Sequence, residues 1–273
     1  MTTRAGVIGS PIGHSLSPAI FTAAFAATGL DWSYEAFEVP EGEAEAFVGR
    51  VRTDLAGLSV TMPHKAAVIP ALDHLSDVAR DLGAVNCIAR DGADLAGHNT
   101  DGPGLVDSLL IDEGLELEGR RVVLLGAGGA GRAVARALGV AGALVTVVNR
   151  SPDRAEEAAR LAGAAGRVGT EDEVADAEII VNATSLGMGA DARLPVDAGR
   201  LAPGLVVVDL VYHPAVTPLL AAAAAAGARP VGGLGMLVHQ AAHAFRLWTH
   251  EDPPVAAMRS GAERSLAERE GAA

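Results

Sequence analysis

The sequence has very little cysteine and no long apolar segment, and these shortages exclude several classes of protein. Cys87 is the only cysteine among 273 residues, so neither an intrachain disulfide nor a cysteine-based metal cluster is available. No apolar run reaches the roughly 20 residues of a membrane-spanning helix, and the start of the chain lacks the apolar core of a signal peptide before Pro11. We therefore expect a cytoplasmic protein.

Positive charge is also scarce. The formal net charge of −13 argues against nucleic acid and anionic membranes as partners, because the chain would be repelled by both. A small molecule is the expected partner, and local donors must hold it if it is anionic. The sequence does not fix the oligomeric state, and a homodimer is compatible with it.

Lysine is nearly absent. Lys65 is the only lysine among the 21 basic residues, and all the others are arginine. Lysine carries a compact ammonium group whose proton affinity depends on its surroundings, whereas arginine stays charged. Lys65 is therefore a candidate for proton transfer, with chance survival in an arginine-rich composition as the alternative.

Glycine, by contrast, is abundant and concentrated in the middle of the chain. Residues 121–125 form a short apolar run that predicts a buried strand. Gly126, Gly128 and Gly131 follow with GxGxxG spacing, and then come a helix and a second strand at 144–148. The unpaired N–H groups at the start of that helix suit a pyrophosphate, so this βαβ unit predicts a dinucleotide site.

The residues after the second strand favour NADP over NAD. An NAD site carries Asp or Glu there, whereas this chain has Asn149 and Arg150, with Arg154 one helical turn later. Two guanidinium groups can pair with a 2′-phosphate and stack on adenine, and they outweigh the nearby Asp153. The alternative is that both arginines are solvated side chains at a helix start.

Strands and helices alternate along the chain, which predicts an α/β fold with two domains. We expect a mostly parallel N-terminal α/β substrate domain and a Rossmann-type NADP domain, with a cleft between them. The boundary is placed near Asp107. Residues 1–106 and 236–273 are assigned to the substrate domain, because the last two helices need a face to cover, and residues 107–235 to the NADP domain.

The expected elements follow from apolar periodicity and from turn residues. Strands are expected at 4–9, 34–39, 56–60, 84–89, 94–97, 121–125, 144–148, 179–182 and 205–209. Helices are expected at 19–27, 41–52, 75–82, 101–114, 133–138, 217–227 and 235–251, with a last one reaching about residue 270. Ser17 is expected to cap the first helix, and Gly139 and Gly142 are expected to break the one at 133–138.

Short motifs rich in hydroxyl, amide and charged side chains occur along nearly the whole chain. They are IGSPIGHSLSP (8–18), GLSVTMPHK (57–65), GAVNC (83–87), HNTDG (98–102), LGAGGAGRA (125–133), NRSPDR (149–154), NATSLGM (182–188), DLVYHPAVTPLL (209–220) and GLGMLVHQAAHAF (233–245). In this order they resemble the motifs of the shikimate dehydrogenase family, and the ordered set is far more specific than any one motif. The resemblance implies reversible reduction of the ring ketone of 3-dehydroshikimate to shikimate by NADPH, a step of aromatic amino-acid biosynthesis.

The resemblance also implies roles for individual residues. Lys65 would donate the proton that the developing alkoxide needs, and Asp101 would hold the ammonium group and a ring hydroxyl, so that the two titrate jointly. The implied substrate ligands are Ser15, Ser17, Ser59, Thr61, Asn86, Tyr212 and Gln240. The implied cofactor ligands are Gly126, Ala127, Gly128, Gly129, Ala130, Asn149, Arg150, Ser151, Arg154, Thr184, Ser185, Leu210, Gly233 and Met236.

Several of these residues could instead have purely structural roles. Asp101 could cap the helix after it, Asn86 could be a turn or strand-end residue, and Gln240 could be an exposed helix position. Tyr212 could only pack, and Met236 could belong to the core.

Two positions depart from the family pattern. Ser59 stands where the lysine motif usually has Asn, and Phe21 stands where the substrate helix usually has His. Ser59 leaves open a related substrate such as quinate or aminoshikimate, usually used with NAD, whereas Phe21 is expected to pack in the core. A binding or regulatory relative without catalysis is the alternative from another class, although the retained Lys65 argues against it.

Histidine spacing gives one further candidate site. His239 and His243 are four residues apart, as in a zinc-binding helix, but Gln240 takes the place of the metalloprotease glutamate and no third ligand is indicated. No metal is expected.

Overall fold

The computed structural model describes residues 2–270, which divide into two compact units. The chain up to Thr100 and the part from Val238 onwards form the first unit, and Asp101–Leu237 forms the second. The limits expected from the sequence, 106/107 and 235/236, lie inside helices α4 (Asp101–Asp107) and α8 (Leu234–Thr249). Each unit has its own sheet.

The first unit contains a mixed six-stranded sheet in the order β2-β1-β3-β5-β6-β4. Its strands are β1 (Thr3–Gly9), β2 (Trp32–Glu38), β3 (Gly57–Val60), β4 (His74–Leu75), β5 (Cys87–Asp91) and β6 (Asp94–His98). Strand β1 pairs parallel with β2 and β3, whereas β5 runs antiparallel to both β3 and β6. The hairpin β5–β6 turns at Gly92, whose φ of 63° suits glycine.

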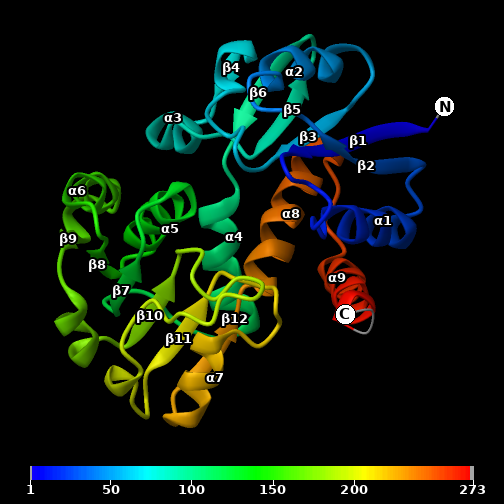
Figure 1. The fold of residues 1–273 in the computed structure, drawn as a ribbon. Coiled ribbons are helices and arrows are strands. Elements are labelled where there is room, and N and C mark those ends of the chain that lie inside the picture. The colour runs from blue at the N-terminus through cyan, green and yellow to red at the C-terminus, as the bar shows by residue number, and fades with distance from the viewer. Residues whose placement is uncertain (1, 271–273) are drawn as a thin grey trace. The chain divides into compact units, whose positions relative to one another are not determined.

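Helices from both ends of the chain cover this sheet. They are α1 (Ser17–Thr28), α2 (Ala44–Thr53), α3 (Asp77–Leu82), most of α8 and α9 (Val255–Glu270), with a short 3₁₀ turn at Ile69–Ala71. Helix α9 packs against α1, and a Cβ added at Gly261 would meet the carbonyl oxygen of Ala19. Close approach of the two backbones therefore fixes α9 against α1 within the first unit, as Figure 1 shows in red and blue.

The expected helix cap at Ser17 is wrong. Leu16 is the N-cap of α1 and makes no side-chain bond, and Ser17 is the first residue of the helix. The N–H of Ser17 donates to Ser15 Oγ over 3.2 Å. The hydroxyl two residues earlier thus takes a capping role, which leaves the Ser17 hydroxyl for other contacts.

The second unit contains an all-parallel six-stranded sheet in the order β12-β11-β10-β7-β8-β9 (Figure 1). Its strands are β7 (Arg121–Leu125), β8 (Leu144–Val148), β9 (Gly166–Val168), β10 (Ile179–Asn182), β11 (Val206–Asp209) and β12 (Arg229–Gly232). Strands β7, β8 and β10 have the expected bounds. The two edge strands, β9 and β12, were not expected, because they are short and mostly exposed and carry no apolar run.

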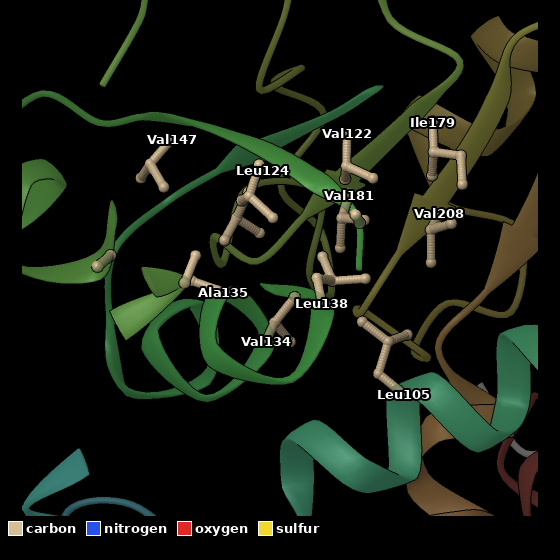
Figure 2. Close-up of a cluster of buried hydrophobic side chains, with 14 of the residues drawn as sticks. Leu105, Val122, Leu124, Val134, Ala135, Leu138, Val147, Ile179, Val181 and Val208 are labelled. Atoms are coloured by element: carbon tan, nitrogen blue, oxygen red, sulfur yellow. The ribbon is translucent and has the colours of Figure 1, made fainter. Parts of the chain in front are cut away.

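Helices on the faces of this sheet complete the Rossmann-type arrangement. They are α4 with a π-helical extension at Ser108–Asp112, α5 (Gly129–Val140), α6 (Pro152–Leu161), α7 (Pro218–Ala225) and the start of α8, with short 3₁₀ turns at Gly163–Ala165, Glu171–Asp176 and Ala198–Arg200. Figure 2 shows Val134 and Leu138 of α5 and Leu105 of α4 facing Leu124 and Val181 of the sheet. Each fully buried leucine contributes about 1.5–3 kcal/mol, and both the strands and the helices supply side chains to this core.

The expected helix break at Gly139 is wrong, because α5 continues to Val140. A Cβ added at Gly139 would meet the backbone of Ala162, so the glycine serves close packing rather than termination. The break expected at Gly142 is confirmed, because α5 ends at Val140 and Gly142 has a φ of 82°. Within the described residues, no helix combines the length and the apolarity needed to cross a membrane.

Candidate active site

The glycines of the glycine-rich loop in the second unit are needed for different physical reasons. Gly126 has a φ of 100°, which side chains rarely tolerate. A Cβ added at Gly131 would meet the carbonyl oxygen of Gly126, so the helix can pass close to the strand end only without one. A Cβ at Gly128 or Gly129 would have nothing within 4 Å, which leaves the surface of the loop open.

Helix α5 begins directly on this open surface. Its N-cap is Gly128, which has no side chain to accept from the first amides of the helix. These N–H groups and the positive end of the helix dipole therefore face the space above Gly128 and Gly129. Such a helix start fits the pyrophosphate of a dinucleotide.

Asn149 links the glycine loop to the segment after β8. Its Oδ1 accepts from the N–H of Ala127 over 3.3 Å, and its Nδ2 donates to the carbonyl of Ser151 over 3.0 Å. Arg150 and Arg154 are exposed, and across residues 2–270 neither side chain makes a hydrogen bond or an ion pair. Both guanidinium groups are therefore available to an anionic group of a ligand.

A buried network fixes the loops after β10 and β11. Asp209 has no exposed surface, and its carboxylate accepts from Asn182 Nδ2 (2.9 Å), Thr217 Oγ1 (2.6 Å) and the N–H of Val211 (3.1 Å). Burial raises the pKa of Asp209 above its ordinary value, although the three donors act in the opposite direction. The carboxylate thereby joins two strands to the start of α7.

The same network orients Thr184. Asn182 Oδ1 accepts from Thr184 Oγ1 over 2.7 Å and from the N–H of Thr184 over 3.0 Å. Thr184 Oγ1 in turn accepts from the N–H of Leu186 over 3.2 Å. The loop that carries the expected cofactor ligands Thr184 and Ser185 is thus held by a chain of bonds that ends at Asp209.

The other expected cofactor ligands also lie in the second unit. Ser185 is exposed, and Leu210 and Met236 are partly buried and pack against the core of this unit. Gly233 lies so close to Leu210 that a Cβ there would meet its carbonyl oxygen. The expected core contact of Met236 is therefore present, and it leaves part of this side chain exposed.

In the first unit, Lys65 lies on the loop after β3 and is partly buried. Its carbonyl accepts from the N–H of Val85 over 2.7 Å. The preceding His64 is buried and its Nε2 donates to the carbonyl of Val39 over 2.8 Å. Bonds on both sides thus fix the backbone that carries the lysine.

Asn86 connects this loop to the segment before α4. Its Oδ1 accepts from the N–H of Thr100 over 2.8 Å, and its Nδ2 donates to Thr100 Oγ1 over 2.9 Å. Nδ2 also lies 3.5 Å from Gln240 Oε1. Asn86 is buried, as is Asp101, which follows Thr100 directly and begins α4. Asn86 is thus the centre of a network and more than a strand-end residue.

The serine loop before α1 is held from two sides. Glu38 accepts from the N–H of Ile12 over 2.9 Å and from Ser10 Oγ over 3.0 Å. Arg269 of α9 donates to the carbonyls of His14 (2.7 Å) and Ser15 (3.1 Å). The loop that carries the expected substrate ligand Ser15 therefore depends on the last helix.

Ser59 is buried and accepts from the phenol of Tyr34 over 2.8 Å. Tyr34 was not among the residues expected from the sequence, because a tyrosine in a strand is ordinarily a packing residue. Phe21 has no exposed surface and stacks on Tyr34 with ring centroids 4.4 Å apart. The expected core position of Phe21 is confirmed.

The expected site residues are divided between the two units. Ser15, Ser17, Ser59, Thr61, Lys65, Asn86 and Gln240 belong to the first unit, whereas Asp101, Tyr212 and all expected cofactor ligands belong to the second. Tyr212 is partly buried in the loop after β11. Of the described residues, no group of three His, Cys, Asp or Glu side chains could hold a metal ion.

Comparison with known proteins decides the family. Residues 7–88 match the shikimate dehydrogenase substrate binding domain, residues 110–189 match shikimate / quinate 5-dehydrogenase, and residues 233–260 match the shikimate 5′-dehydrogenase C-terminal domain. The shikimate dehydrogenase (NADP(+)) of Citrifermentans bemidjiense is 45% identical, over 98% of this chain and 96% of that protein.

The chain belongs to the shikimate dehydrogenase family. The shikimate 5-dehydrogenase of Thermus thermophilus, in complex with NADP(H) and shikimate, is 40% identical with a TM-score of 0.91, over 97% of this chain and all of that one (100%). Quinate dehydrogenase from Corynebacterium glutamicum, in complex with NAD, is 33% identical with a TM-score of 0.86, over 95% and 98%. The resemblance inferred from the motifs is confirmed, and so is the expected α/β fold class with two domains, of which the second is of the Rossmann type.

Proposed function

We propose that this protein is an NADP-dependent shikimate dehydrogenase, which reversibly reduces 3-dehydroshikimate to shikimate in aromatic amino-acid biosynthesis. The observation that carries the proposal is the match over nearly the full chain to curated NADP-dependent shikimate dehydrogenases, together with the fixed loop that presents Lys65. When bound, NADPH supplies the hydride that reduces the ring ketone.

The residues of the second unit fit NADP. The open helix start at Gly128 and Gly129 would hold the diphosphate, and Arg150 and Arg154 would pair with the 2′-phosphate. Thr184, oriented by Asn182, would lie near the nicotinamide. Among the relatives, the Thermus enzyme holds NADP(H) and the Corynebacterium enzyme holds NAD, so the arginines support the choice of NADP here.

Lys65 and Asp101 would carry the proton chemistry. The Lys65 ammonium group would hold a proton at the ketone oxygen and donate it as the alkoxide develops. Asp101 follows Thr100, which Asn86 fixes, and it would hold the ammonium group and a ring hydroxyl. The pair is treated as one unit, because interacting groups share their protons.

Neutral side chains would bind the substrate. Ser15, Ser17, Ser59, Thr61, Asn86, Tyr212 and Gln240 offer hydroxyl and amide groups that pair with a ring polyol without adding charge. Because such a site leaves buried polar groups unpaired when a substrate hydroxyl is missing, it can discriminate strongly between related rings.

Two alternatives remain for the same site. The quinate or aminoshikimate branch, usually with NAD, is supported by Ser59 and by the similarity to a quinate dehydrogenase. The second alternative is a protein of this family that binds the ligands but does not catalyse the reaction, although it retains Lys65. The cytoplasmic location expected from the sequence is also a proposal, as is the homodimer with which the sequence is compatible, and a single buried thiol is compatible with the cytoplasmic location.

Initial rates with shikimate and with quinate, each with NADP and with NAD, test the proposal. Activity that is highest for shikimate with NADP is the expected result. A preference for quinate or NAD would move the protein to the related branch. Absence of turnover with all pairs, combined with measurable NADP binding, would support the binding relative.

A further inference from the structure

Tyr34 is a buried phenol that lies between two of the expected substrate ligands. It is 7% exposed, and its hydroxyl donates to Ser59 Oγ over 2.8 Å. The Ser17 hydroxyl also acts on this phenol, because both serines lower the pKa of Tyr34 against the larger effect of burial, which raises it. The hydrogen bond to Ser59 thus joins this phenol to the buried strand β3.

Aromatic packing fixes the Tyr34 ring. The Phe21 ring is stacked on it with an interplanar angle of 12°, and the Trp248 ring lies 6.1 Å away, tilted by 31°. Trp248 is itself fixed, because its Nε1 donates to the carbonyl of Ile88 over 3.0 Å. The Phe21 and Trp248 rings also lie 4.9 Å apart, and a ring packed in such an aromatic cluster keeps its hydroxyl in one direction.

The hydrogen bond from Tyr34 determines which further hydrogen bonds the Ser59 hydroxyl can make. A serine hydroxyl has one proton to donate and two lone pairs that accept. Since burial raises the pKa of Tyr34 far above its ordinary value, the phenol stays protonated and donates to Ser59. Ser59 Oγ therefore accepts from one fixed side, and its own proton is directed elsewhere.

We propose that Tyr34 is a positioning residue for substrate recognition, which fixes Ser59 so that its hydroxyl proton points at an oxygen of a hydroxylated ring substrate. The inference rests on the proposed function, since it takes Ser59 to be a substrate ligand. A donor oriented before binding loses less rotational freedom when the ligand arrives, so its effect falls on affinity rather than on the chemical step.

Four variants test the proposal by steady-state kinetics: Tyr34→Phe, Ser59→Ala, the double variant, and Thr28→Val as control. Tyr34→Phe keeps the stacked ring and removes only the hydroxyl. We expect about a 3- to 10-fold rise in KM for shikimate, as the loss of one buried hydrogen bond produces. For Tyr34→Phe we expect kcat to stay unchanged, and likewise the KM for NADP. For the double variant we expect a KM for shikimate no higher than that of Ser59→Ala alone. Thr28→Val removes a hydroxyl that bonds only within α1 and should leave KM for shikimate unchanged.

The outcomes separate the proposal from the function on which it rests. Independent, multiplying effects of the two single variants would overturn the proposal, and so would a Tyr34→Phe variant with a lower melting temperature but an unchanged KM. A wild-type enzyme without shikimate turnover would instead contradict the proposed function before any variant is compared.

Discussion

The two units build their sites in different ways. In the second unit, the proposed cofactor site is made largely of backbone: glycines that allow close approach, and the open start of α5. In the first unit, the proposed substrate site is made of side chains such as Ser15, Ser59 and Asn86, held by partners far away in the sequence. The backbone site comes largely from one continuous segment of the sequence, whereas the side-chain site is brought together from distant segments by folding.

On the substrate side, substitution of Lys65 should have the largest effect on turnover. Lys65→Ala removes the proposed proton donor, so kcat should fall by about 10²–10⁴-fold while NADP still binds. Lys65→Arg is the matched control, because it keeps the charge but donates its proton poorly. Turnover and NADP affinity measured in the same preparation check this, and near-normal kcat in either variant would contradict the role of Lys65.

On the cofactor side, Arg150→Ala should weaken NADP selectively. Loss of charge-assisted hydrogen bonds to a 2′-phosphate corresponds to about 1.5–3 kcal/mol, or roughly a 10- to 100-fold rise in KM for NADP. The KM for NAD should hardly change. Arg160→Ala, on the last turn of α6, is the control for the loss of one positive charge. An equal rise for both cofactors would remove the proposed reason for NADP selectivity.

The glycine loop can be tested with a matched pair of variants. Gly131→Ala places a Cβ against the carbonyl of Gly126 and should lower the free energy of unfolding by about 1–3 kcal/mol. Gly128→Ala adds a Cβ in open space and should leave stability within about 0.5 kcal/mol, while raising KM for NADP because the methyl group meets the cofactor. Thermal unfolding and kinetics of the two variants check this contrast. Equal stabilities would contradict it.

Asp209 should have a smaller, pH-dependent effect on the free energy of unfolding. Because burial raises the pKa of folded Asp209 above its ordinary value of 3.8, folding takes up a proton between the two values. The contribution of this group to the free energy of unfolding should therefore decrease as pH rises through that window. Asp209→Asn should remove this dependence.

The same substitution should also destabilise the second unit at neutral pH. An amide nitrogen would replace one acceptor where Asn182, Thr217 and Val211 all donate, at a cost of about 1–3 kcal/mol. Denaturant unfolding from pH 4 to pH 8 measures both effects. Parallel pH profiles for the wild type and the variant would contradict the assignment of the dependence to Asp209.

The local and the non-local parts of the molecule differ in how well the sequence predicts them. Strands β7, β8 and β10 have the expected bounds, because a short, β-branched apolar run next to turn residues is typical of a strand buried in a parallel sheet. The cap at Ser17 and the break at Gly139 were wrong, because each was decided by a partner: Ser15 Oγ in one case and Ala162 in the other.

The site residues show the same difference between features set by local sequence and features set by distant partners. The glycine loop and its arginines can be predicted from spacing, whereas the substrate ligands needed the resemblance to a family. Tyr34 and Asp209 were missed altogether, since their importance depends on Ser59, Asn182 and Thr217, which lie up to 27 positions away. No local pattern marks such partners.

The central claim is that Ser59 of the first unit serves substrate recognition and Arg150 of the second unit serves cofactor selection, and the double variant of Ser59→Ala with Arg150→Ala tests it most directly. We predict that Ser59→Ala raises only KM for shikimate and Arg150→Ala only KM for NADP. The double variant should then show both changes, additive within about 0.5 kcal/mol, or roughly twofold. An Arg150→Ala enzyme with an equally raised KM for shikimate, or a strongly non-additive double variant, would contradict the claim.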